Sequence, residues 1–427
     1  MVAMAKERGF QDFFGVIDDP RVDRCKTHAL IDILFLCVAG TVVGCEGPSD
    51  IAEFAREKLA WFRRFVPLKN GVPSHDTIGR VIGLLKPEQF QRAFLDWVTS
   101  FVDSAGERGE PHFVPIDGKT LRGSHGAKGR EHPLHLVSAW ASAQGLTLGQ
   151  VAVDDKSNEI TAIPRLLEML ELKGAIISID AMGCQKEIAD KIVKAEADYV
   201  LAVKDNQPKL AAALADFFSQ RHEQGDFAEH HCRQHSTREK SRGRIEERYY
   251  IVAPLPESMQ EFVSDWRGLC SIGQVISQTT RGDKHTSEVR YYITSREPRV
   301  KEFATAVRGH WSIESMHWVL DVVFGEDASR LRNGHATENF GFLRKFILSL
   351  LKQDTSRGSL KVKRKRAGWS TDFLETILFY EVHPTDACAV LRKERTCGFL
   401  KRVTTLVFRR VPHVLGVVVS GVSGEGL

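Results

Sequence analysis

Three acidic residues occupy positions where a carboxylate could do chemistry. Asp117 ends an apolar run that starts at His112, and Asp180 ends a second apolar run that starts at Ala175. Glu314 lies at the start of a segment with helical spacing. Two acids at strand ends and a third on a helix suit a site that holds two divalent ions ~3.5–4 Å apart and acts on a phosphodiester. Because Mg²⁺ prefers carboxylate oxygens, magnesium is the expected metal.

Each acid taken alone has an ordinary structural explanation, either a turn-capping Asp or the polar face of an amphipathic helix. Asp117 and Asp180 recur at equivalent strand ends, where open α/β sheets tend to bind ligands. Asp180 also precedes a helix start, where backbone N–H groups face an anion. Glu314, His317 and Asp321 follow the i, i+3, i+7 spacing of one helix face. The set of three acids is therefore a stronger indication than any single member.

Several basic and aromatic residues flank these acids. Lys119, Arg122 and Lys204 are candidate phosphate contacts, with ordinary surface charge as the alternative. DNA contacts are also predicted for a group around and after Glu314, namely Arg308, His310, Trp311, Arg330 and Arg332. These residues would position a nucleic-acid backbone beside the carboxylates.

Two further clusters have competing interpretations. Residues 357–366 carry six bases and no acid, which is typical either of a solvated flexible run or of a phosphate-binding segment. A second cluster is rich in metal-ligand residue types: His230, His231, Cys232 and His235. Its spacing fits no standard zinc pattern, so a solvated loop is the favoured interpretation.

Composition sets broad limits. The 427 residues suffice for two or three domains with a sizeable core. A net charge of +4 permits a polyanionic partner without requiring one. The eight cysteines form no CxxC pair, so we expect free thiols in a reducing compartment. The N-terminus lacks the apolar core of a signal peptide, and no window reaches the ~18 apolar residues of a membrane helix. A cytoplasmic protein with no membrane partner is expected.

The elements that must position the acids follow from hydrophobic periodicity. Residues 1–105 are predicted to be mostly helical. Strands are predicted at 112–116, 135–140, 146–153, 175–179 and 199–203, with helices at 163–172 and 186–197. This β-β-β-α-β-α-β order is that of an RNase H-like domain, an analogy of topology. Strand-like segments at 247–252, 269–279 and 288–294 predict a β-rich insertion, and helices return over 301–353.

The predicted fold class is α/β, a mixed sheet flanked by helices, and it divides into three parts. Residues 1–105 form a helical N-terminal domain with a DNA-binding role. Residues 106–355 form the catalytic domain, with its β-rich insertion at about 205–300. Residues 356–427 comprise the basic segment and a poorly ordered C-terminal tail.

Three motifs carry a resemblance to a known family. The segments Pro115–Lys119, Ser178–Gly183 and His310–Glu314 resemble those of DDE transposases of bacterial insertion sequences. The group that includes the H-repeat-associated proteins of Rhs elements is the most similar. Further matches lie at Phe54–Phe65 and Leu320–Asn339, so the resemblance covers roughly residues 10–375.

The resemblance implies an RNase H-like catalytic core in which Asp117, Asp180 and Glu314 are the catalytic, metal-binding acids. It implies two Mg²⁺ ions, with Mn²⁺ as a substitute, and DNA cleavage at element ends followed by strand transfer. The implied partners are double-stranded DNA, as terminal inverted repeats and target, and further copies of the chain in a dimer or larger synaptic complex. The implied location is the bacterial cytoplasm, at the nucleoid.

Two departures leave alternatives open. Many related transposases place Tyr, Arg and Lys at fixed steps around the glutamate, whereas this chain has Val307, His310 and Asp321 there. Asp321 is therefore a rival for the third acid. The chain also departs from the family beyond about residue 380. The alternative functions are a catalytically inactive DNA-binding remnant of a transposable element and a general nuclease of the same fold.

Overall fold

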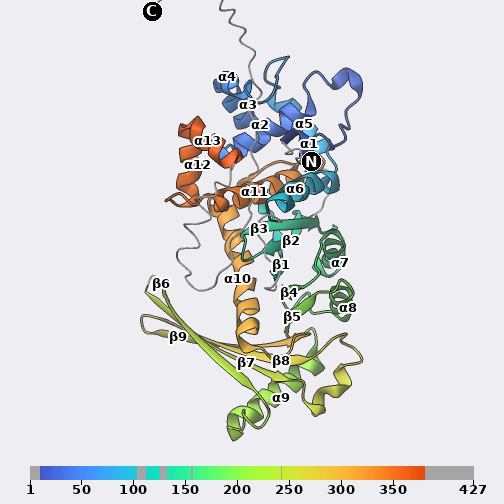
Figure 1. Cartoon of the computed structure of the whole chain (residues 1–427), viewed down its shortest axis with the longest axis vertical. Coiled ribbons are helices and arrows are strands. Elements are labelled where there is room, and N and C mark those ends of the chain that lie inside the picture. The colour runs from blue at the N-terminus through green and yellow to red at the C-terminus, as the bar shows by residue number, and fades with distance from the viewer. Residues whose placement is uncertain (1–9, 103–111, 126–131, 155–156, 242, 380–427) are drawn as a thin grey trace, which may run out of the picture.

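A computed structural model describes residues 10–102, 112–125, 132–154, 157–241 and 243–379. Its described strands form one nine-stranded mixed sheet in the order β3-β2-β1-β4-β5-β9-β8-β7-β6 (Figure 1). The first five are β1 (His112–Thr120), β2 (His135–Ala141), β3 (Leu146–Ala152), β4 (Ala175–Ile179) and β5 (Asp198–Val203). The other four are β6 (Arg233–Ser241), β7 (Arg244–Pro254), β8 (Ser271–Arg281) and β9 (Lys284–Thr294).

The first half of the sheet has the predicted order of elements. β1 pairs antiparallel with β2 and parallel with β4, and β4 pairs parallel with β5. Helices α7 (Glu159–Met169) and α8 (Lys186–Lys194) follow β3 and β4. The predicted β-β-β-α-β-α-β succession and the mixed sheet flanked by helices are confirmed at this level.

Helices cover both faces of the central strands, which explains why every residue of β4 is buried. Successive side chains of a strand point to opposite faces. Ile177 accordingly packs in the cluster that contains residues of α7 and α8. Ile176 packs in the other cluster, against Phe303 and Val307 of α10 (Val300–Val322). α10 therefore lies on the sheet face opposite α7 and α8.

The β-rich insertion is continuous with this sheet. It begins with α9 (Pro208–Gln224) and ends with β9, which pairs antiparallel with β5 from Val200↔Thr294 to Val203↔Tyr291. The predicted strands at 247–252, 269–279 and 288–294 are confirmed within β7, β8 and β9. β6 was missed because its sequence, RQHSTREKS, is polar throughout and mostly exposed.

The helices from the two halves of the chain share one core. The N-terminal ones are α1 (Phe10–Phe14), α2 (Leu30–Val43), α3 (Pro48–Glu57), α4 (Leu59–Phe62), α5 (His75–Leu84) and α6 (Pro87–Val102). The later ones are α11 (Ala336–Gln353), α12 (Leu360–Trp369) and α13 (Thr371–Leu378). All contribute to a single hydrophobic cluster, in which the Phe94 and Phe346 rings lie 4.2 Å apart (Figure 1). The predicted division at 105 and 355 stays a prediction.

The basic run at 357–366 is largely helical and not a flexible tail. Ser359 caps α12 by accepting a hydrogen bond from the Val362 N–H. The predicted tail beyond residue 380 lies outside the described residues.

Among the described helices, none alone is long and apolar enough to cross a membrane. α2 and α3 meet the length and composition criteria only as a pair, bent by 95°.

Candidate active site

Strand register brings Asp117 and Asp180 together. In the parallel pair β1–β4, Ile116 lies opposite Ile179, so the next residue on each strand is one of the two acids. Neighbouring strands lie ~4.8 Å apart, which places the two acids at the same level. The sequence predicted that Asp117 lies at the end of its strand, but in the structure it lies within β1. β1 continues to Thr120 because β2 keeps pairing with it after β4 has stopped.

Asp180 combines a structural contact with an electrostatic cost. Its Oδ1 accepts hydrogen bonds from the N–H groups of Met182 (3.1 Å) and Gly183 (3.3 Å). This is the turn-capping role expected of a single Asp. Burial raises the pKa of Asp180 above its ordinary value, and the nearby negative charges of Glu159 and Asp117 raise it further. A cation bound between these carboxylates would relieve the repulsion.

Asp117 has an imidazole partner on α10. His317 Nδ1 lies 3.4 Å from Asp117 Oδ2, and the imidazole is buried. Burial by itself would raise the Asp117 pKa, but the hydrogen bond and charge of His317, with the charge of His310, hold it below its ordinary value. Nε2 of His317 has no hydrogen-bond partner among the described residues. Asp117 is thus kept ionised while Asp180 is pushed towards neutrality.

Glu314 lies one turn before His317 on α10. Together with Asp180 it lines a polar cavity of about 180 Å³, whose other walls include Lys204, His310 and Trp311. Its side chain is exposed, and no described residue hydrogen-bonds or ion-pairs with its carboxylate. The fold therefore brings Glu314 to the edge of the sheet where the two aspartates lie.

The site has the donor chemistry for magnesium without a closed coordination shell. Carboxylates are the ligands that hard divalent cations prefer, and three of them border this region. Within the described residues, no group of three or more His, Cys, Asp or Glu side chains is gathered closely enough to hold a metal ion. The residue types therefore fit the metal.

Asp321 and Lys119 form an ion pair with each other. Lys119 Nζ pairs with Asp321, with Glu326 Oε2 (2.8 Å) and with Asp327 Oδ1 (3.4 Å). Burial would lower the Lys119 pKa, but Glu326 and Asp321 raise it, so the ammonium stays charged. Asp321 is tied up in this cluster, which disfavours it as the third acid. The predicted DNA contact of Lys119 is inconsistent with an ammonium that is buried and surrounded by three acids.

Trp311 joins α10 to the β-rich insertion. The guanidinium carbons of Arg248, Arg290 and Arg308 lie 4.5, 5.5 and 5.4 Å from the centre of its ring. Such distances are within the range of cation–π attraction. Arg308 also pairs with Glu239 of β6, 2.9 Å away. The predicted DNA contacts at Arg308 and Trp311 are therefore engaged within the protein.

The remaining predicted contacts are more accessible. His310 lies in the cavity wall, with Nδ1 3.3 Å from Ser178 Oγ. Four basic side chains are exposed to solvent: Arg122, Lys204, Arg330 and Arg332. Arg122 and Arg330 lie on neighbouring loops, because a Cβ on Gly123 would be 2.4 Å from the Ser329 carbonyl oxygen.

A Glu–His–Thr chain beside the site was missed in the sequence. Glu159, the first residue of α7, has Oε1 2.7 Å from His135 Nε2, and His135 Nδ1 is 2.8 Å from Thr120 Oγ1. A Cβ on Gly118 would lie 2.2 Å from that Glu159 oxygen. The local signal in the sequence was Asn158, whose side chain caps α7. A capping residue indicates where a helix begins, but it does not indicate which strand the following residue, Glu159, contacts.

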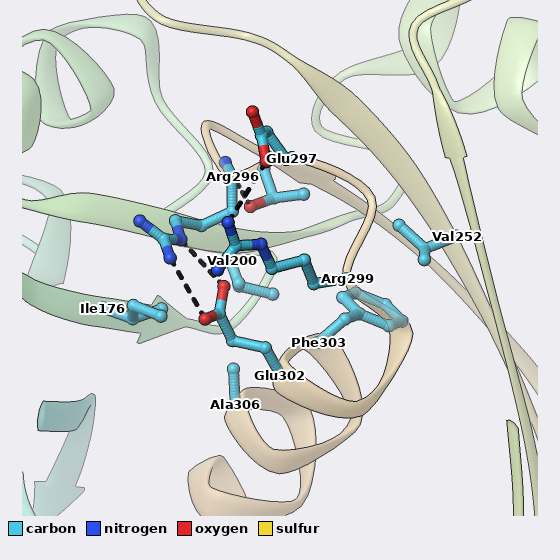
Figure 2. Close-up of a pocket in the computed structure, with 10 residues that line it drawn as sticks. Ile176, Val200, Val252, Arg296, Glu297, Arg299, Glu302, Phe303 and Ala306 are labelled. Atoms are coloured by element: carbon cyan, nitrogen blue, oxygen red, sulfur yellow. Dashed lines mark hydrogen bonds and ion pairs between the residues drawn. The ribbon is translucent and has the colours of Figure 1, made fainter. Parts of the chain in front are cut away.

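Two other places carry no ligand site. His230 Nε2 contacts Arg221 (2.8 Å) and Asp226 (3.3 Å), and its neighbours gather no metal-binding group within the described chain. Figure 2 shows residues that line a small cavity where α10 begins. Its volume of about 10 Å³ leaves room for at most one water. There Arg296 joins Glu302 (2.8 Å) to Asp198 (3.0 Å), anchoring the start of α10 to the sheet.

Comparison with known proteins agrees with the resemblance. Residues 11–98 match the family described as DDE_Tnp_1-associated, and residues 108–351 match the Transposase DDE domain. The chain is 40% identical over 372 residues to "Putative transposase YncI" of Escherichia coli O157:H7, covering 86% of this chain and 93% of the relative. It is 37% identical over 375 residues to "H repeat-associated putative transposase YhhI" of Escherichia coli K12, covering 86% and 97%. The chain belongs to the DDE transposase family.

Proposed function

We propose that this chain is an insertion-sequence transposase that cleaves DNA at the ends of its element and transfers the strands into target DNA. The catalytic core would be RNase H-like. The support is the sheet order β3-β2-β1-β4-β5, in which β1, β4 and β5 are parallel and β2 is antiparallel to β1. This is the arrangement expected from that topology. The observation that carries the proposal is the register that sets Asp117 beside Asp180.

Asp117, Asp180 and Glu314 are proposed to hold two Mg²⁺ ions, which Mn²⁺ could replace. Asp117 and Asp180 would share the first, and Glu314 would complete the second. When bound, such ions stabilise the charge on the attacking and leaving oxygens of a phosphodiester. His317 orients the Asp117 carboxylate, and the Met182 and Gly183 N–H groups orient that of Asp180.

The proposed partner is double-stranded DNA, as terminal inverted repeats and as target. The exposed bases Arg122, Lys204, Arg330 and Arg332 would contact phosphates and contribute a salt-dependent part of the affinity. Because transposition joins two element ends, a dimer or a larger synaptic complex is proposed as the active form.

Replacing Asp180 tests the proposal. Asp180→Asn should reduce Mg²⁺-dependent cleavage of terminal-repeat DNA by more than about 100-fold, the upper loss for an outer-shell partner of a metal. DNA binding should stay within about twofold in the same assay. Asp205→Asn, the same chemical change at an exposed neighbouring position, is the matched control and should cleave normally. Undiminished cleavage by Asp180→Asn would remove Asp180 from the mechanism.

The same assay separates the alternative functions. A wild-type protein that binds terminal-repeat DNA and never cleaves it would be an inactive DNA-binding remnant. Cleavage of unrelated duplexes at the same rate would indicate a general nuclease.

A further inference from the structure

We propose that the outward side of α12 is a second DNA-contacting surface, which binds the phosphate backbone of duplex DNA away from the cleavage site. This α12 outer face consists of Lys361, Val362, Lys365, Arg366 and Trp369. The inference rests on the proposed function, because it supplies the DNA that the face would bind. It resolves the two interpretations of the basic run 357–366.

The fold sorts the bases of this run into two groups. Lys363 and Arg364 point inward and are buried. Lys363 Nζ lies 3.0 Å from Asp354 Oδ2, and Arg364 donates to the Thr41 carbonyl at 3.0 Å while stacking on Phe324. These two bases have a structural role: Lys363 attaches α12 to the end of α11, and Arg364 attaches it to α2 and to the residues that follow α10.

Among the outward bases, Arg366 donates to Ser356 Oγ at 3.4 Å and lies over the Phe373 ring, whereas the two lysines have no such contacts within the described chain. At 100° per residue, the five residues of the α12 outer face fall within an arc of about 140°, and the buried residues occupy the opposite side. Residues 355–371 contain no Asp or Glu. Neither Lys361 nor Lys365 forms an ion pair or hydrogen bond with any described residue. The face is therefore a cationic ridge whose charges are not neutralised within the described part of the protein.

Trp369 extends the ridge formed by Lys361 and Lys365, at i, i+4 and i+8. Its side chain is 77% exposed, the highest value among the exposed large hydrophobic residues of the described chain. Unpaired lysines are depleted from the cores of protein interfaces, which argues against a protein partner. Lysines that no acid neutralises are instead typical of surfaces that contact the phosphates of duplex DNA, and an exposed indole N–H can donate to a phosphate oxygen.

The α12 outer face is separate from the cavity that holds Asp180 and Glu314. Trp311 lines that cavity, whereas Arg364 of α12 donates to the carbonyl of Val323, at the far end of α10. The twelve residue steps from Trp311 to Val323 span about 18 Å of helix. Figure 1 shows α12 beside the upper end of α10, with the insertion strands at its lower end. One duplex longer than the cleavage site could thus meet both.

The test compares two double variants of the full-length chain. Lys361→Ala/Lys365→Ala removes the two unpaired lysines of the ridge. Lys209→Ala/Lys301→Ala removes the same charge from exposed, unpaired positions elsewhere. Binding to a duplex carrying the terminal repeat is measured over 50–300 mM salt. Losing two phosphate contacts should lower the slope of log Kobs against log salt by about 1.8, and the control should keep the wild-type slope.

Trp369→Ala should weaken binding several-fold without changing that slope, because it removes a contact and no charge. Thermal unfolding should be unchanged in all three variants, since every replaced side chain is exposed. An unchanged slope and affinity for Lys361→Ala/Lys365→Ala would overturn the proposal. An equal loss in both double variants would also overturn it, because the effect would then come from net charge. So would loss of self-association with DNA binding intact, which would identify a protein interface.

Failure of this inference is distinguishable from failure of the proposed function. The salt slope of binding reports on the α12 outer face, cleavage by the wild type reports on the proposed function, and Asp180→Asn should keep the wild-type salt slope. If the wild type cleaves DNA and the lysine substitutions leave binding unchanged, only the proposed α12 surface is contradicted. A wild type with the expected lysine effect and no cleavage contradicts only the transposase proposal.

Discussion

At the scale of the residue, the position after Asp117 has almost no room. A Cβ on Gly118 would lie 2.2 Å from Glu159 Oε1 and 2.4 Å from His135 Nε2. Asp117 faces α10, so Gly118 faces the other side of the sheet, where the Glu159–His135 pair lies against it. A glycine next to the catalytic candidate is thus explained by packing and not by backbone conformation.

Gly118→Ala should therefore destabilise the protein by about 1–3 kcal/mol, the usual cost of overpacking, and should reduce cleavage by displacing Asp117. Adding Glu159→Ala removes the nearest obstructing atoms, so the double variant should recover about 0.5–3 kcal/mol relative to the sum of the single changes. Chemical denaturation measures the cycle. Gly79→Ala, whose new Cβ would meet Pro48 at an ordinary 3.4 Å, is the control and should be neutral or slightly stabilising. Strict additivity would show that Glu159 does not restrict Gly118.

At the scale of elements, α10 is fixed to β1 by two charged contacts in register. Asp117 meets His317, and two residues along the strand Lys119 meets Asp321, one turn along the helix. The second contact continues into a buried network at Glu326, which also faces Lys345 and Arg344. Burial lowers the pKa of Lys345 to about 8, so keeping this buried lysine charged costs free energy. The network keeps the helix that carries Glu314 aligned with the strand that carries Asp117.

Glu326 should be the most sensitive member of that network. Glu326→Gln leaves buried cations without their anion and should destabilise the protein by about 3–5 kcal/mol, measured by denaturant unfolding at pH 7. Asp327→Asn changes an acid that is partly exposed and lies 3.4 Å from Lys119 Nζ, another member of the network. This variant should lose less than about 1 kcal/mol of stability. Equal costs for the two variants would mean that burial does not set the strength of this network.

The Glu326 contribution should also depend on pH. Burial by itself would raise its pKa, but the charges of Lys345, Lys119 and Arg344 hold it below the ordinary value of 4.5. A folded-state pKa below the unfolded one stabilises the protein above the unfolded pKa, and this stabilisation is lost as pH falls through the folded pKa. The stability difference between wild type and Glu326→Gln should therefore shrink as the pH falls below about 4.5.

At the scale of the whole molecule, helices from the two ends of the described chain share a core. Leu374 and Ile377 of α13 are buried in the same cluster as Leu34 and Leu36 of α2. Trp61 Nε1 donates to Glu375 Oε1 at 2.9 Å, linking α4 to α13. The N-terminal helices therefore hold in place the bases of α12 that are proposed to face DNA. A substitution at one end of the described chain should change the stability of the other end.

Leu374→Ala tests this connection. Deleting a fully buried leucine should cost about 2–5 kcal/mol and should speed amide hydrogen exchange in α2, over 300 residues away in sequence. Leu84→Ala, at a side chain that is 45% exposed, should leave exchange in α2 unchanged. Wild-type protection of α2 in Leu374→Ala would show that the two ends are energetically independent.

Features that depend on local pattern were predictable from the amino-acid sequence. Apolar runs and helical spacing predicted five core strands, the main helices and the three acids, because periodicities of two and 3.6 residues are written in consecutive side chains. The motifs around Asp117, Asp180 and Glu314 also sufficed to assign the family. β6 was missed for the same reason, since a polar edge-like strand has no apolar alternation to detect.

Which side chains meet became known from the folded chain. It set Asp117 level with Asp180, placed Glu159 against Gly118 and turned Lys119 inward to Asp321 and Glu326. It also divided the bases of 357–366 between the core and the surface. These outcomes depend on strand register and on partners more than 200 residues distant in the sequence. The free energy of a charged side chain is set by the groups that surround it after folding, which no local pattern specifies.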